Sequence, residues 1–508
     1  MDMIIGYGGI LLFTGVVVFV MSRRGRTDVD MSEYATGGRN FSSWFGTMSF
    51  LNTWIAGTVF VSFAGMTAGS GVIGFYSLTY GVLAVVLMFF LGKPVNQWGR
   101  VHDLRTQADL LGLRYNSRAV RVVAGIIGVV ASIPWVVLGM QALGLVFSTL
   151  SFGRIEPVVG LVIGVVFIAA RQIWTVRYGT RGLIVSDMVQ GIVAYGFGFL
   201  IILGLLVWLV TNGHGLGQLA PGMLALPGLD SPVGPLYLFS LMFTGLMGAW
   251  SWPDIFVRLL SVRSPRSVQK SAVQAATLMF VFSAALVMLC LLASSYPGVS
   301  DAPDLVWFTV TGVGGVGLVT AAGICVVAAT MGNVGANLQA TGTQLVNDVV
   351  FPNRRVESPT GAKIAIAAIT IVSALAALFT ANVTSGILIL ALISYQAICQ
   401  LAPTILLGIF WRRATAAGAT AGMIAGILVA AVLEISYPVS IPWLGGLTSG
   451  VAGIIVNTAL IVAFAFLKPA DADERKRVDR LFDSLRTQPM GPSTRVHVAA
   501  GADAEVAP

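Results

Sequence analysis

The sequence predicts an all-α polytopic membrane protein with about thirteen transmembrane helices. Of its 508 residues, 56% are hydrophobic and only 10% are charged, whereas a soluble protein of this length carries about a quarter charged residues. Apolar runs of about 20 residues, the length that spans a bilayer, recur almost to the end of the chain. These runs are continuously apolar rather than alternating, which favours helices over a transmembrane barrel.

The predicted spans alternate with loops of opposite character. They begin at about residues 3, 44, 73, 119, 155, 181, 235, 271, 306, 364, 385, 414 and 443. Basic loops follow the odd-numbered spans: 23–26, 100–121, 171–181, 258–270, 354–363 and 412–413. The opposite loops are mostly acidic, with Arg154 as the exception. Because basic loops stay inside, this pattern predicts an outer N-terminus and a cytoplasmic C-terminus in a bacterial plasma (inner) membrane.

Charge, cysteines and motifs restrict the function classes. The net charge of +8 is explained by the basic loops, so we expect the lipid bilayer, and no nucleic acid, as a partner. Cys290, Cys325 and Cys399 lie in apolar runs without metal-ligand spacing, which argues against disulfides, zinc or another cofactor. The spans hold no HExxH pair, GxSxG elbow or Walker loop, so we expect neither an enzyme nor an ATP-driven pump.

Two domains are expected along the chain. Residues 1–467 form the transmembrane domain, whose first run, 3–21, is too long for a usual signal peptide and is interpreted as a retained span. Residues 468–508 form a polar cytoplasmic tail, partly disordered, that is too short for a catalytic domain. Within the tail, residues 473–486 are predicted to form an amphipathic helix, with an apolar face of Val478, Leu481, Phe482 and Leu485.

The second and seventh spans are both interrupted by polar, Gly or Pro residues. Residues 49–58 read SFLNTWIAGT, and residues 244–254 read TGLMGAWSWPD. Such residues often serve only close helix packing. However, the two segments lie five spans apart, so they enter the membrane from opposite sides. This arrangement predicts two inverted repeats, about 44–211 and 235–410, whose first helices unwind at mid-membrane and free backbone groups for ions and solutes.

Three further segments resemble signatures of the sodium:solute symporter family. Residues 177–190, RYGTRGLIVSDMVQ, are similar to its glycine, apolar run and hydroxyl–Asp–x–x–Gln pattern. Residues 403–419 resemble its Pro…Phe-Trp-basic-basic…Thr…Gly-Ala pattern, and residues 328–348 resemble its sodium-site helix. The resemblance covers about residues 1–486. It implies a leucine-transporter-type 5+5 inverted repeat with one extra N-terminal and two extra C-terminal helices, and secondary transport by alternating access.

The resemblance also implies a cation site. In the family, two backbone carbonyls of the first broken helix bind sodium, and these fall at Asn52 and Ile55. A further carbonyl falls at Ala329, and two adjacent hydroxyls fall at Gly332 and Asn333. Gly332 offers no side-chain oxygen and Asn333 only an amide carbonyl. Because Na⁺ requires several oxygen ligands, we expect Na⁺ to bind weakly or to be replaced.

The sequence therefore does not decide which ion, if any, is coupled to transport. A second sodium site would need hydroxyls where Gly335 and Ala336 stand, so it is expected to be absent. The alternatives are coupling to Na⁺, coupling to H⁺ or transport without coupling. The three histidines lie outside the spans, in loops or the tail.

Asp187 is the best candidate for a proton or ion path. It matches the family's Asp in the sixth span, and carboxylates inside membranes are costly and usually functional. The alternative is a helix cap or a pair with a loop arginine such as Arg181. Asp254 and Arg258, four residues apart, are interpreted as a structural helical ion pair.

Candidate substrate contacts are polar and aromatic side chains expected to face the broken segments. Aromatic bodies with polar tips suit a pocket for a small solute, although each of these residues could instead serve packing or anchor the helix at the interface. The cluster 394–396, which interrupts an apolar span, is favoured. The full set is Thr53, Trp54, Thr58, Tyr76, Gln141, Trp250, Ser394, Tyr395 and Gln396.

The expected function is secondary active uptake of a small organic solute. Gly245, Gly248 and Ala249 stand where the family's sugar transporters have polar contacts, which disfavours sugars. Residues 133–141 are more similar to the monocarboxylate and pantothenate permease branch, so a monocarboxylate is the first candidate, before amino acids and other small metabolites. The alternatives are a transport-deficient membrane solute sensor, which the short tail disfavours, and an uncoupled facilitator.

Overall fold

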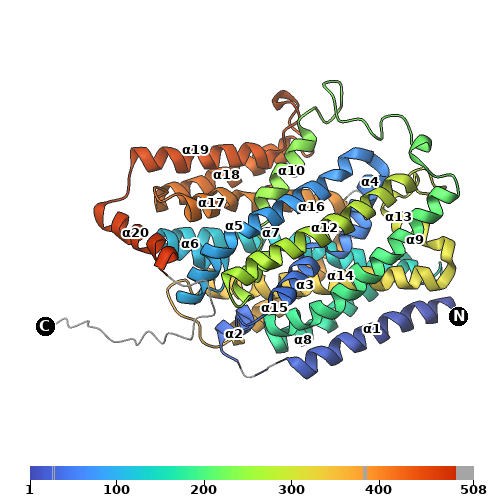
Figure 1. The fold of residues 1–508 in the computed structure, drawn as a ribbon, viewed down its shortest axis with the longest axis horizontal. Coiled ribbons are helices and arrows are strands. Elements are labelled where there is room, and N and C mark those ends of the chain that lie inside the picture. The colour runs from blue at the N-terminus through green and yellow to red at the C-terminus, as the bar shows by residue number, and fades with distance from the viewer. Residues whose placement is uncertain (26, 28, 381–385, 488–508) are drawn as a thin grey trace.

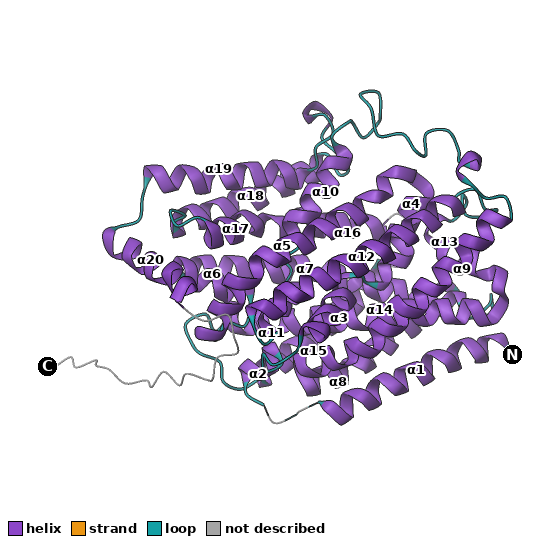
Figure 2. Cartoon of the chain, viewed as in Figure 1, coloured by secondary structure: helices purple, strands orange, loops and turns teal. Residues whose placement is uncertain are grey.

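The chain folds into a single type of secondary structure. A computed structural model describes residues 1–25, 27, 29–380 and 386–487. These residues are mostly helical and contain no β-strand, only two isolated bridges. Most of the long helices run in a common direction, with the tail helix at one end of the molecule (Figures 1 and 2). The all-α fold class predicted from the apolar runs is confirmed.

The first predicted repeat follows α1 (Asp2–Arg24) and the short helix α2 (Met31–Thr36). Its main helices are α3 (Ser43–Trp54), η1 (Val59–Phe63), α4 (Ala64–Ser70), α5 (Tyr76–Val101), α6 (Gln107–Tyr115), α7 (Arg118–Thr149), α8 (Pro157–Gly191) and α9 (Gly198–Thr211). Thr106 begins the connecting helix α6 by accepting a hydrogen bond from the amide of Asp109, and Asn116 ends it in the left-handed conformation (φ 46°).

The second predicted repeat is built in the same way and is followed by three further helices. Its members are α10 (Tyr237–Gly248), α11 (Pro253–Ser261), α12 (Pro265–Ala293), α13 (Val306–Thr311), α14 (Gly315–Gln344), η7 (Leu345–Val350), α15 (Thr360–Phe379), α16 (Gly386–Ile398) and α17 (Ala402–Phe410). The helices that follow are α18 (Ala416–Ser436), α19 (Ser449–Leu467) and α20 (Ala472–Thr487).

Ten helical stretches are long and apolar enough to cross a membrane, within the described residues. One of them, Pro157–Thr211, has 55 residues and would measure about 80 Å as a single helix, more than twice the thickness of a bilayer core. Gly179 divides it, because its backbone (φ 58°, ψ −157°) is not helical. The predicted seventh span is split into two short halves, α10 and α11. The count of thirteen stays a prediction.

Both predicted helix breaks are present. α3 ends at Trp54, where Ile55 leaves the helical region (φ −87°, ψ 87°). α10 ends at Gly248, and α11 restarts at Pro253, which has no N–H to continue the preceding helix but suits a first helical position. The half-helices α3 and α11 contact each other, and α14 packs against both. The two breaks are thus joined through α14.

The structure agrees with one predicted boundary and moves another. The span expected from residue 306 lies in the apolar helical stretch Pro303–Val350, in which α13 starts at Val306 and the long helix α14 starts at Gly315 (φ 66°). The loop expected at 171–181 is mostly helix, because α8 continues as far as the kink at Gly179. Arg171 is therefore a buried helical residue and not a loop residue.

The tail helix α20 packs against the bundle. The indole of Trp98 donates a hydrogen bond of 3.1 Å to the carbonyl of Leu481 and stacks edge-on against Phe482. Val478 and Leu481 are buried. The amphipathic helix predicted here is confirmed, whereas the predicted disorder of the last dozen residues lies outside the described part of the chain.

Candidate functional site

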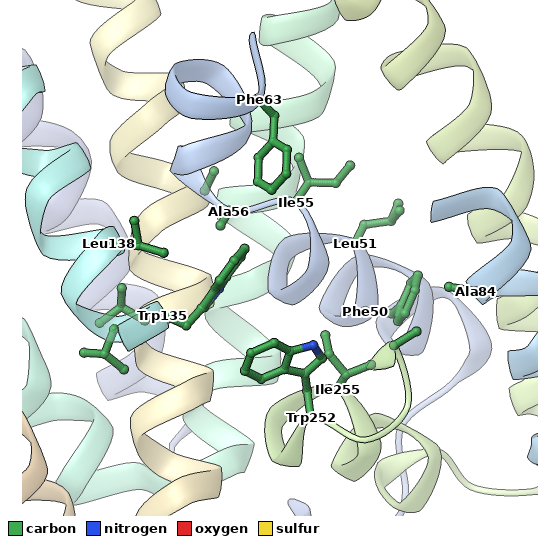
Figure 3. Packing of buried hydrophobic residues seen from close by; sticks show 14 of the residues in the cluster. Phe50, Leu51, Ile55, Ala56, Phe63, Ala84, Trp135, Leu138, Trp252 and Ile255 are labelled. Atoms are coloured by element: carbon green, nitrogen blue, oxygen red, sulfur yellow. The ribbon is translucent and has the colours of Figure 1, made fainter. Parts of the chain in front are cut away.

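An aromatic cluster surrounds the break in the first broken helix. Trp135 of α7 packs against Trp252 and Tyr395, with ring centroids 5.7 Å away in both cases. Tyr80 contacts Trp54 at 5.6 Å and Tyr395 at 5.9 Å. Figure 3 shows Trp135 and Trp252 reaching from different helices toward the segment of Ile55 and Ala56. Sequence reasoning missed Tyr80 and Trp135, because nothing in one sequence shows that their helices meet at the break.

A small cavity lies beside this break. Its volume is about 30 Å³, roughly that of one water molecule in the liquid. Trp54 and Ile55 line it from the first broken helix, Tyr80 from α5, Trp135 from α7 and Cys290 from α12. The described lining residues include no Lys, Arg, Asp or Glu. The cavity therefore suits an uncharged group or a group whose charge is met by hydroxyl, indole and backbone donors.

Several predicted substrate residues are buried and carry a polar atom that has no hydrogen-bond partner in the described part of the chain. These atoms are the hydroxyls of Thr58, Tyr76 and Ser394 and the Oε1 of Gln141. Buried polar groups are normally hydrogen-bonded, so these unpaired atoms are candidates for hydrogen bonds to water or to a ligand. Thr58 is the best placed of them, because it precedes Val59 and follows Ile55, which both line the cavity.

The other predicted substrate residues have partners in the protein. The Thr53 hydroxyl donates to the carbonyl of Ser49 in its own helix, and the Trp250 indole donates to the carbonyl of Ala84. Gln396 accepts a 2.9 Å hydrogen bond from the amide of Gly450. Tyr395 shares a 3.0 Å hydrogen bond with the hydroxyl of Tyr80. Of this group, only Tyr395 belongs to the aromatic cluster around the break.

Asn333 joins the first broken helix to α7. Its Nδ2 donates to the carbonyl of Thr53 at 2.6 Å, and its Oδ1 accepts from Nε1 of Trp135 at 3.1 Å. A carbonyl can only accept and an indole N–H can only donate, so the amide cannot be turned round. The amide oxygen that was expected to replace a sodium-binding hydroxyl is therefore directed at Trp135.

The remaining predicted cation ligands are the position of Gly332 and the backbone carbonyls of Asn52, Ile55 and Ala329. Gly332 supplies no side-chain oxygen, and any Cβ added there would overlap Nδ2 of Asn52. The hydroxyl of Tyr195 lies 2.8 Å from the carbonyl of Leu51 and 3.1 Å from that of Ile55, and it has one proton to share between them. The structure thus brings the predicted residues together. However, the amide oxygen of Asn333 accepts from Trp135, so neither position of the family's hydroxyl pair offers Na⁺ a free side-chain oxygen, and these two positions do not fit the family's sodium site.

Asp187 is the centre of a buried polar network. Its Oδ2 accepts from the hydroxyl of Ser49 at 2.7 Å, and its Oδ1 accepts from Nδ2 of Asn52 at 3.0 Å. Nη2 of Arg258 lies 3.9 Å from Oδ2. Arg258, expected as the helical partner of Asp254, instead reaches across to Asp187, and the described residues show no ion pair between Asp254 and Arg258. The alternative pairing of Asp187 with Arg181 does not form.

A family model and several known proteins match this chain. The model of the sodium:solute symporter family matches residues 34–426. An uncharacterised symporter of Bacillus subtilis (strain 168), YhjB, is 25% identical and matches 92% of this chain and 98% of its own length. A monocarboxylic acid transporter of Corynebacterium glutamicum is 23% identical, matching 84% of this chain and 83% of that protein. The sodium/pantothenate symporter of Escherichia coli (strain K12) is 24% identical, with 82% and 87% matched.

Solved structures share the fold. A Na⁺-coupled sialic acid symporter superposes with a TM-score of 0.74 at 18% identity, covering 92% of this chain and 98% of that one. Mhp1, a nucleobase-cation-symport-1 family transporter, gives 0.53 at 17% identity, with 88% and 97% covered. At these identities the likeness concerns the fold alone. The family match, over most of the chain, shows that this protein belongs to the sodium:solute symporter family and carries out secondary active uptake of a solute.

Proposed function

We propose that this protein takes up a small organic acid, with a monocarboxylate as the first candidate, across the plasma membrane. The driving force is an inward gradient of Na⁺ or H⁺, and the bundle exposes the site to each side in turn. Two of the relatives support this substrate class, since one is named a monocarboxylic acid transporter and the other a sodium/pantothenate symporter. Pantothenate is itself a monocarboxylate.

The observation that carries the proposal is the small aromatic-lined cavity at the helix break. Trp54, Tyr80 and Trp135 present large apolar faces there. Next to the lining residue Val59, the buried hydroxyl of Thr58 has no hydrogen-bond partner among the described residues. A short organic acid has an apolar body for the aromatic faces and a carboxylate that accepts hydrogen bonds from hydroxyl and freed backbone N–H groups. A carbohydrate would need many more polar partners than this lining supplies.

Transport requires the solute to reach the cavity from each side in turn. The cavity is small, about 30 Å³, and we expect its lining side chains to move apart as a solute enters. Rocking of the bundle against the remaining helices supplies this opening. Closure then surrounds the solute with aromatic faces and excludes water, which strengthens its hydrogen bonds.

The test is uptake into proteoliposomes. Radiolabelled acetate, pyruvate and proline are offered under an inward Na⁺ gradient, an inward H⁺ gradient, or neither. We expect acetate or pyruvate to accumulate under at least one gradient and proline to accumulate under none. Equilibration without accumulation would identify a facilitator, and uptake of none of the solutes would refute the monocarboxylate proposal.

A matched pair of variants tests the site itself. Trp54→Ala removes a cavity wall and should lower uptake at limiting solute about tenfold, the effect of losing roughly 1.4 kcal/mol of binding. Trp443→Ala is the control, because Trp443 lies in the short helix η9 (Pro442–Leu444), away from the cavity lining, and is 63% exposed. Equal uptake by both variants would place the solute elsewhere.

A further inference from the structure

Arg171 is a charged side chain buried in the middle of the bundle. It lies in α8 and is 1% exposed. Its Nη1 donates to the hydroxyl of Thr175 one turn along the same helix, and its Nη2 lies 3.5 Å from the hydroxyl of Ser186. Ser186 immediately precedes Asp187 in α8. A guanidinium is costly to bury without such compensation.

The guanidinium occupies space that a glycine of α14 leaves open. A Cβ added to Gly335 would overlap Nη1 of Arg171, so any larger residue at position 335 would displace the guanidinium. Gly335 lies three residues, about 4.5 Å of helix rise, beyond Gly332. Arg171 therefore lies one helical turn from the predicted cation ligands, where a second set of hydroxyl ligands was expected to be missing.

The charges in this region balance without an added ion. The carboxylates are Asp187 and Asp254, and the guanidinium groups are Arg171 and Arg258; all four side chains are at most 2% exposed. Arg258 lies 3.9 Å from Asp187. In a medium of low dielectric constant, a further cation beside two guanidinium groups would be repelled over several ångströms.

The groups around the expected cation position are mainly donors. Asn52 directs Nδ2 at Asp187 and Gln190, and Asn333 directs Nδ2 at Thr53. The Tyr195 hydroxyl is shared between the carbonyls of Leu51 and Ile55. One side-chain oxygen, Oδ1 of Asn52, has no donor among the described residues. Beyond the three expected backbone carbonyls, those of Asn52, Ile55 and Ala329, the hydroxyl pair that completes the family's oxygen shell therefore has no counterpart here.

We infer that Arg171 is a resident cation that takes the place of a coupling Na⁺ beside the first broken helix. Its guanidinium joins α8 to α14 through the gap at Gly335, a role that a bound ion would otherwise fill. Uptake by this protein then does not require Na⁺. The inference rests on the proposed function. Of the two gradients proposed there as the driving force, only the H⁺ gradient then remains.

The first experiment measures binding of radiolabelled Na⁺ to the purified full-length protein. The wild type should show no saturable binding at millimolar Na⁺. Arg171→Gln removes one positive charge, so that Arg258 alone faces the carboxylates of Asp187 and Asp254, and this variant should gain saturable binding. Arg171→Lys keeps the charge and should bind as little as the wild type. The double variant Arg171→Gln with Asp187→Asn should also show no binding, because neither charge remains.

Two results would overturn the inference. One is saturable Na⁺ binding by the wild type, which decides the question even if Arg171→Gln does not fold. The other is a monodisperse Arg171→Gln variant that binds no more Na⁺ than Arg171→Lys. Because this assay contains no organic solute, its result is independent of whether the substrate is a monocarboxylate.

The second experiment tests the consequence for transport. Pyruvate uptake by the wild type should stay within about twofold when all Na⁺ is exchanged for N-methylglucamine, whereas a tenfold loss, equivalent to about 1.4 kcal/mol, would contradict the inference. Absence of pyruvate uptake in both media would count against the proposed substrate, and the binding experiment would then decide the role of Arg171.

Discussion

At the scale of single residues, Asn333 stabilises the break in the first broken helix through hydrogen bonds. The helix break frees the carbonyl of Thr53, and Asn333 satisfies that carbonyl while also accepting from Trp135. All three residues are buried. One amide thus connects α14, the first broken helix and α7, the three elements that meet beside the cavity.

We predict that Asn333→Ala destabilises the protein substantially. The change leaves the Thr53 carbonyl and the Trp135 indole N–H buried without partners, at about 1–3 kcal/mol each. The measurement is the thermal unfolding midpoint of the purified protein in detergent. Asn212→Ala is the matched control, since Asn212 is exposed at the end of α9. Similar midpoints for the two variants would show that the bridge contributes little.

Asp103 is the centre of a second network, outside the spans. Burial would raise the pKa of its carboxyl, but the Ser32 hydroxyl and the guanidinium groups of Arg39, Arg105 and Arg355 outweigh this and hold the pKa below its ordinary value. The nearest of these guanidinium groups is that of Arg355, at 2.7 Å. Asp103 has a left-handed backbone (φ 52°), a conformation that Asn also adopts readily.

The depressed pKa predicts a defined pH dependence. The ionised Asp103 stabilises the folded state fully above the unfolded pKa of about 3.9, and this contribution is lost as the pH falls through the lower folded-state pKa. Asp103→Asn should therefore unfold earlier at pH 7, by roughly the 1.5–3 kcal/mol of a charge-assisted hydrogen bond. The difference in unfolding free energy between the variant and the wild type should become smaller as the pH falls below about 4. If this difference does not depend on pH, the loss of stability comes from packing and not from the charge of Asp103.

At the scale of secondary-structure elements, Gly179 separates two helices that would otherwise be continuous. Its φ of 58° and ψ of −157° belong to a region that only glycine occupies easily. A Cβ there would also overlap the ring and backbone of Tyr34 in α2. The turn between the two halves of α8 thus depends on the absence of a side chain.

We predict opposite effects for two Gly→Ala variants. Gly179→Ala should lower stability or prevent folding, since backbone strain alone costs about 1–3 kcal/mol. Gly204→Ala in α9 should be neutral or stabilising by up to about 1 kcal/mol, because Ala favours a helix and no atom lies within 4 Å of the new Cβ. Yield of monodisperse protein and its unfolding midpoint are the measurements. Equal yields and unfolding midpoints for the two variants would contradict the proposed role of Gly179.

At the scale of the whole molecule, the proposed orientation can be tested through the loops. The native cysteines Cys290, Cys325 and Cys399 are buried, so they should not react with a membrane-impermeant maleimide. Ser300 and Ser358 are exposed in the loops after α12 and after η7. These loops lie on opposite predicted sides of the membrane.

We predict that Ser300→Cys is labelled in intact cells, whereas Ser358→Cys is labelled only after the membrane is permeabilised. The reason is that the basic loop around Ser358 stays in the cytoplasm if the N-terminus lies outside. The wild type, labelled in neither state, is the control. The reverse labelling pattern would invert the orientation, and labelling of both variants in intact cells would contradict the predicted alternation of the loops.

The sequence alone determined the fold class and the positions of the two helix breaks. The apolar runs require helices because lipid offers no hydrogen bonds to the backbone. The breaks were visible because Asn52, Gly57 and Pro253 interrupt apolar runs at matching places. Both signals are local, depending on neighbouring residues, and local signals can be detected in one sequence.

Only the tertiary structure decided which atoms meet at the breaks. In the sequence, Arg171 and Arg258 are assigned to basic loops, but both are buried in the structure. Arg171 lies beside Gly335, and Arg258 lies beside Asp187. Likewise, the sequence could not show that the Asn333 amide oxygen is directed at Trp135 and not at a cation. These features depend on contacts between helices far apart in the chain, where the direction of a side chain is set by packing and by hydrogen-bond satisfaction rather than by its neighbours in sequence.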